Sequence, residues 1–177
     1  MNMVHERLTG TTLPVESLLF EGSTYDLGWD GRRGNVDHDF PGLPTADFAL
    51  FLVNAVKFHV CQLFHLFDES TFMYYFKLYY DDPTKRDRYP DLWYIHFLLI
   101  LAFGKAFIVR TGKGRTPPGA DLFIQAMKLL PDMTFVRTDP VQAIELLSCA
   151  ALYLQCLDLR SSAYNMVRFS SLEQGSC

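Results

Sequence analysis

The segment DLWYIHFLLILAFGKAFIVR, residues 91–110, constrains the fold of this chain more than any other. It is apolar around nearly its whole circumference at the helical period, and such a helix has to be covered on several sides by other elements. Pro90 suits its first turn, where a missing N–H costs nothing, and Arg110 complements the helix dipole at its end. The apolar run from Ile95 to Val109 is too short for a typical membrane span and contains a histidine and a lysine. We therefore expect a central helix, among the most buried segments from Trp93 to Val109, and no membrane partner.

Shorter amphipathic segments on both sides of this run predict a fold made of helices. Apolar residues recur at i, i+3 and i+4, and caps and proline breakers separate the segments. The expected helices are one that begins near Thr45, Glu69–Tyr80, Asp91 to about Arg110, Ala120–Leu130, one capped by Asp139 that runs from Pro140 to about Leu157, and one that opens at Ser161–Val167. The apolar stripe expected on the first helix is Phe48, Phe51, Leu52, Ala55, Val56, Val60 and Leu63. No strand-period alternation stands out, so the predicted fold class is all-α, an irregular array of five to six helices.

Residues 1–44 differ from the rest of the chain. They are rich in glycine and turn-forming residues and show little helical period, as in STYDLGWDGRRGNVDHDFPGLP. We expect a loop-rich N-terminal segment over residues 1–44 and a single helical domain over residues 45–177, since a chain of 177 residues fits one domain.

Charge and cysteine usage exclude some functions. A formal net charge of −4 gives no sign of the basic surface that nucleic-acid binding favours, so the chain by itself is not expected to bind DNA. The four cysteines, Cys61, Cys149, Cys156 and Cys177, form no CxxC pair, which favours reduced thiols in the cytosol or nucleus.

Two groups of residues superficially resemble binding motifs. Residues 112–116, GKGRT, follow a helix and lack the spacing of a phosphate loop, so a helix-terminating loop is the better interpretation. His59, Cys61 and His65 can each bind a metal, but no i, i+4 pair or HExxH pattern is present, so histidines at the edge of the core are expected.

Other candidates also have a structural explanation. His96, inside the apolar run, is expected to be a core histidine with satisfied hydrogen bonds, and a role as a base stays open. Asp81 and Asp82 fit a solvated turn, and the mixed charges of residues 85–88, KRDR, fit an exposed linker. We assign no catalytic, cofactor-binding or metal-binding residue, and we expect a protein that is not an enzyme.

A dense aromatic cluster follows the first helix. It comprises Phe64, Phe67, Phe72, Tyr74, Tyr75, Phe76, Tyr79 and Tyr80. Such a cluster is typical of a core or a helix-docking surface, and the alternative is a hydrophobic cavity for a small apolar effector.

Several segments in order resemble one protein family. Residues 62–72, QLFHLFDESTF, are similar to an "hPLFPxLxxxTF"-like turn, residues 101–104 are LAFG, and residues 151–155 are ALYLQ, followed by a small-residue linker and Tyr164. Over about residues 44–164 this order resembles the fungal-specific transcription factor domain, the regulatory middle domain of fungal zinc-cluster transcription factors.

The resemblance implies a function in transcription regulation. It implies a non-catalytic fragment of a DNA-binding regulator, nuclear in its full-length form, with promoter DNA, a homodimer and a small-molecule effector as partners. The family binds DNA and zinc through a six-cysteine cluster that this chain lacks, so no cofactor is expected here. For a fragment, we expect an exposed apolar patch along Ala143–Leu157 and around Phe72–Tyr80. The alternative is a small all-α enzyme or ligand-binding protein with an aromatic-lined pocket.

Overall fold

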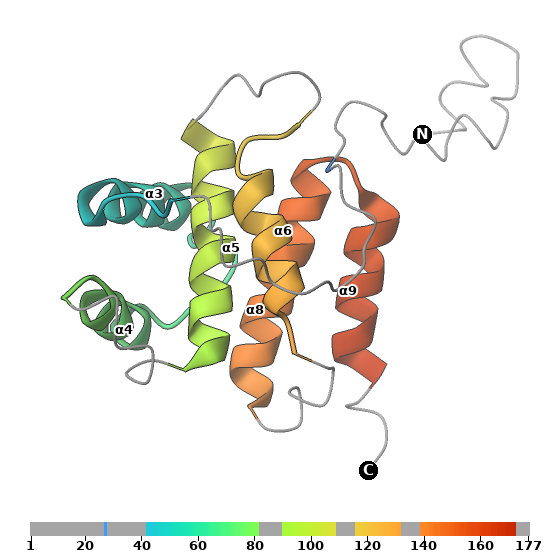
Figure 1. Cartoon of the computed structure of the whole chain (residues 1–177). Coiled ribbons are helices and arrows are strands. Elements are labelled where there is room, and N and C mark those ends of the chain that lie inside the picture. Colours follow the sequence, from blue (N-terminus) through green and yellow to red (C-terminus); the bar gives the residue numbers. More distant parts are fainter. Residues whose placement is uncertain (1–26, 28–41, 82–89, 109–115, 132–138, 173–177) are drawn as a thin grey trace, which may run out of the picture.

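The computed structural model describes Leu27 and residues 42–81, 90–108, 116–131 and 139–172, with side chains up to Val167. Within these residues it contains six α-helices and no strand, which confirms the predicted all-α class. The helices, labelled as in Figure 1, are α3 (Ala46–His59), α4 (Glu69–Asp81), α5 (Asp91–Ile108), α6 (Ala120–Leu129), α8 (Pro140–Cys156) and α9 (Arg160–Leu172). Most of the predicted loop-rich segment 1–44 lies outside the described residues.

Helix α5 lies at the centre of the array, as its composition predicts. It packs against α3, α6 and α8, and α9 completes the array by pairing with α8 (Figure 1). Its buried residues are Trp93 and every residue from Ile95 to Gly104. By length and apolar composition α5 could cross a membrane, but 61% of it is buried inside the structure, as in the core helix of a globular domain.

Burial of α5 ends earlier than predicted. Phe107 and Ile108 are partly exposed at the edge of the core, where Phe107 stacks on His59 of α3 with ring centroids 5.0 Å apart. Lys105 in the same turn reaches Asp121 of α6 at 3.2 Å. The last turn therefore makes contacts at the surface rather than in the core, and Val109 lies outside the described residues.

Two glycines allow the closest approaches to α5. A Cβ atom on Gly104 would lie 2.7 Å from the backbone oxygen of Leu52 in α3. Gly119, just before α6, has φ +84°, and a Cβ there would lie 2.3 Å from the backbone oxygen of Ala102. Both positions require glycine so that backbones can meet.

The buried face of α3 differs from the predicted stripe. The helix does bury Leu52, Ala55 and Val56, but Phe48 is 42%, Phe51 51% and the following Leu63 80% exposed. The face turned to the core consists of Ala49, Leu52, Val53, Ala55 and Val56. Because α3 is apolar on both sides, packing decides which face is buried: the face that contains Leu52, whose backbone meets Gly104 of α5, lies against the core, and Phe48 and Phe51 lie outside it.

Capping residues define the starts of α4 and α8. The backbone N–H of Thr71 donates to Asp68 at 2.8 Å, and that of Gln142 donates to Asp139 at 3.1 Å. Thr45 is at the predicted cap position of α3 but makes no side-chain cap hydrogen bond. Helix α3 ends at His59, before Val60 and Leu63 of the predicted stripe, and α9 continues to Leu172, while the other bounds lie within two residues of those predicted.

The predicted apolar patch on residues 143–157 is largely wrong. Helix α8 is covered by α5 on one side and α9 on the other, and of its large apolar side chains only Val141 and Ile144 are exposed. In Phe72–Tyr80, Phe72, Phe76 and Tyr79 are buried and Tyr74 is exposed. Several exposed large apolar side chains lie instead on and after α3: Phe48, Leu50, Phe51, Phe58, Leu63 and Phe64.

Candidate functional site

A small cavity lies where α4, α5 and α8 meet, with a volume of about 250 Å³. Its walls combine aromatic rings, carboxylates and neutral polar groups. The lining residues are Phe67, Asp68, Thr71, Phe72, Tyr75, Pro90, Trp93, His96, Asp139, Val141, Gln142 and Glu145. We call this site the α4–α5–α8 cavity.

His96 is the buried polar side chain of this cavity. It is 2% exposed, and burial lowers its pKa to about 4, so the ring is neutral at pH 7. The ring donates a hydrogen bond to the backbone of Leu66, while Nε2 has no hydrogen-bond partner in the part of the chain that the structure describes. This arrangement assigns the proton to Nδ1 and leaves Nε2 as an acceptor. The expected core location is confirmed, but the described residues do not satisfy all of its hydrogen bonds as expected.

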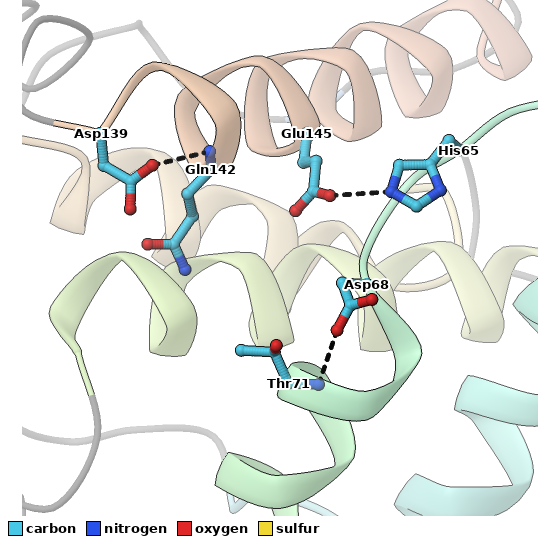
Figure 2. A network of polar contacts seen from close by, with 6 residues as sticks. All are labelled: His65, Asp68, Thr71, Asp139, Gln142 and Glu145. Atoms are coloured by element: carbon cyan, nitrogen blue, oxygen red, sulfur yellow. Dashed lines mark hydrogen bonds and ion pairs between the residues drawn. The ribbon is translucent and has the colours of Figure 1, made fainter.

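Carboxylates from three places along the chain line the same cavity, and Figure 2 shows their side chains. Asp68 and Asp139 cap α4 and α8. Hydrogen bonds from Thr71 lower the pKa of the Asp68 carboxyl. Glu145 accepts from His65 Nε2 at 3.1 Å; burial raises the pKa of Glu145, and His65 partly offsets that rise. The cavity therefore carries negative charge at neutral pH.

Stacked aromatic rings support the opposite wall. Trp93 lies parallel to Phe97 at 5.2 Å between ring centroids, and it contacts Phe72 at 5.8 Å and Tyr75 at 5.9 Å. The edges or faces of Phe67 and Phe72 pack on the His96 ring at 6.3 and 6.0 Å. These contacts hold the wall in one arrangement, which suits a preformed binding site.

The lining residues decide which interactions the cavity can make. No serine, cysteine or lysine is among the described lining residues. The low pKa makes His96 a weak base at neutral pH. The cavity thus offers carboxylates, aromatic faces and neutral polar side chains such as Thr71 and Gln142.

The structure does not bring the metal-capable residues of the sequence together. His59 packs on Phe107, His65 pairs with Glu145, and Cys61 is a half-buried free thiol whose pKa burial raises. Among the described residues no group of three or more His, Cys, Asp or Glu could hold a metal ion. Cys149 and Cys156 are free thiols too.

Other sequence candidates fall partly outside the described residues. These are residues 112–115 of the GKGRT loop, Asp82, residues 85–88 and Cys177. Asp81 is the exposed last residue of α4. Three of the predicted aromatic cluster, Phe67, Phe72 and Tyr75, line the cavity, which is more polar than the predicted apolar one.

Sequence reasoning missed the convergence of Asp68, His96, Asp139 and Glu145. The sequence predicts Asp139 as a helix cap and leaves Asp68 or Ser70 as the cap of Glu69–Tyr80, and a cap position does not reveal that both helices start at one cavity. One signal was present: Glu145 is the one charged residue of α8, whose other side chains are mostly apolar.

A second, more apolar groove of about 460 Å³ lies between α8 and α9. Its lining includes Phe64, Leu152, Tyr164 and Val167. Apart from Arg160 it offers no charged group among its described lining residues, so it presents less recognisable chemistry than the α4–α5–α8 cavity.

Comparison with protein-family models, with curated proteins and with solved structures finds no match.

Proposed function

We propose that this chain is part of the non-catalytic regulatory domain of a transcription regulator of the fungal zinc-cluster class, nuclear in its full-length form. In this proposal, promoter DNA is bound by a zinc cluster that is not part of this sequence. The helical domain transmits regulation, as a homodimer or through a small-molecule effector. An effector acts in this way only if it binds two states of the domain unequally.

One observation carries the proposal: segments that underlie the family resemblance pack on one another. Gly104 of the LAFG segment meets Leu52 of the first helix, and Phe103 of that segment packs edge-on against Tyr153 of the ALYLQ segment at 6.2 Å. Tyr153 also stacks on Phe123 of α6 at 4.6 Å and donates to the Pro118 carbonyl at 3.1 Å. Motif residues distant in sequence thus form one core, as expected if their order reflects one domain.

The test is the full-length transcript together with the location of its product. Sequencing of complete transcripts is expected to show a six-cysteine cluster encoded in frame with these helices, and a fluorescent fusion at the native locus is expected in the nucleus. A transcript without such a cluster, with a product spread through the cytosol, would overturn the proposal.

The α4–α5–α8 cavity favours a second candidate function, a small all-α ligand-binding protein. The observation behind it is that the stacked ring of Trp93 and the side chain of His96, whose Nε2 has no partner among the described residues, line the same cavity. Two results together would favour this function over the regulatory one. The isolated chain would be a stable monomer that binds a ligand saturably, and deletion of its gene would not change transcript levels.

A further inference from the structure

We propose that the α4–α5–α8 cavity binds a small organic cation, a protonated amine carried on a compact aromatic or aliphatic body. The inference deepens the proposed function, since the amine would be the effector of the regulatory domain, but the binding site itself rests on the geometry of the cavity.

The charge of the lining points to a cation. Asp68, Asp139 and Glu145 come from two helix starts and the buried side of α8, and all three border the same space. Among the described lining residues there is no lysine or arginine to neutralise them. His65 reaches Glu145 from outside the lining and is largely exposed. An anionic ligand would be repelled here.

His96 supplies independent evidence for a ligand with an N–H group. Its Nε2 is a buried acceptor without a partner among the described residues, and a buried polar group in that state is destabilising. His96 lines the cavity, and the donor group of a ligand that reaches Nε2 would satisfy it. A purely apolar ligand would leave Nε2 of His96 without a donor and would bring no positive charge to the carboxylates of the cavity.

The aromatic wall fits the same ligand class. Phe72, Tyr75 and Trp93 surround the cavity on the side of α4 and α5, and aromatic faces attract ammonium groups as well as apolar bodies. The volume of about 250 Å³ is slightly below that of pockets for drug-sized molecules, so the ligand is small. A single-ring or short-chain amine meets these requirements.

Benzylamine is a suitable probe, with benzyl alcohol, toluene and benzoate as neutral, apolar and anionic counterparts. Binding to the full chain is measured at pH 7 by calorimetry and by the fluorescence of Trp93 in a Trp29→Phe background, because these are the two tryptophans of the sequence. We expect saturable binding of benzylamine, at least about tenfold tighter than benzyl alcohol, and no binding of benzoate.

Substitutions of lining residues test whether benzylamine binds in this cavity. Glu145→Gln and His96→Asn are each expected to weaken benzylamine binding at least about fivefold. Asp68→Asn and Asp139→Asn remove charge while keeping a good capping side chain, so they are expected to weaken binding in a folded protein. The matched control is Asp81→Asn, an exposed acid outside the cavity, which should leave binding unchanged. Circular dichroism verifies the fold of each variant.

The outcomes separate this inference from the proposed function. No saturation with benzylamine up to about 10 mM, equal or tighter binding of the alcohol, toluene or benzoate, or unchanged binding in folded Glu145→Gln would overturn the amine site. None of these results bears on the zinc cluster in the transcript or on nuclear location. Conversely, amine binding by a product that lacks both would leave the site in place and overturn the regulatory role.

Discussion

Acid should destabilise this fold through protonation of His96, at a higher pH than the one at which most carboxylates of the protein become protonated. The pKa of His96 is about 4 in the folded chain against 6.5 for the free side chain, because burial penalises the imidazolium. The unfolded chain therefore binds more protons than the folded chain between these pH values, and stability is lost as pH falls below about 6.5. In the steep part of this window the folding equilibrium shifts by nearly a factor of ten per pH unit, which amounts to roughly 2 kcal/mol between pH 7 and pH 4.5.

Other groups titrate nearby, so the measurement must isolate His96. Asp68 and Glu145 line the same cavity: the lowered pKa of Asp68 acts only at still lower pH, and the raised pKa of Glu145 opposes the effect of His96. His96→Asn removes the titrating ring and keeps an amide that can donate to the Leu66 carbonyl. The difference in unfolding free energy between the native chain and this variant cancels the shared contributions.

Urea unfolding followed by circular dichroism at several pH values between 7 and 4.5 provides that difference. We expect the advantage of the native chain over His96→Asn to shrink steadily with falling pH, by roughly 2 kcal/mol in total. A difference that stays constant over this range would refute the reasoning, since it would mean that His96 is charged in the fold or open to solvent.

Three further predictions concern packing, capping and DNA. Gly104→Ala should destabilise the chain by about 1–2 kcal/mol in urea unfolding, although alanine favours a helix, because its Cβ would lie 2.7 Å from the Leu52 oxygen; a stabilised variant would show that α3 does not approach so closely. Asp139→Ala should lower stability by about 1 kcal/mol and Asp139→Asn by much less, because asparagine also caps; equal losses would contradict the capping role. In electrophoretic mobility assays the isolated chain, with its net charge of −4, should not bind duplex DNA beyond a generic acidic protein, and salt-dependent micromolar binding would contradict this.

Local sequence signals were sufficient to place the helices. Asp139 followed by Pro140 starts α8, Pro131 limits α6, and the apolar circumference of residues 91–108 makes α5 the core helix. These signals work because a cap, a proline or a helical apolar pattern acts within a turn or two of its own position. They are readable without knowledge of any distant contact.

Tertiary structure alone decided which surfaces meet. Helix α3 could bury either of two apolar faces, and the buried face is the one that contains Leu52, which meets Gly104, so the choice depends on α5. The cavity also depends on tertiary structure. Taken one at a time, Asp68, His96 and Glu145 are explained locally, as a cap, a core residue and a charge on a helix. Their gathering around one space results from the packing of α4, α5 and α8, which long-range contacts determine and no local pattern encodes.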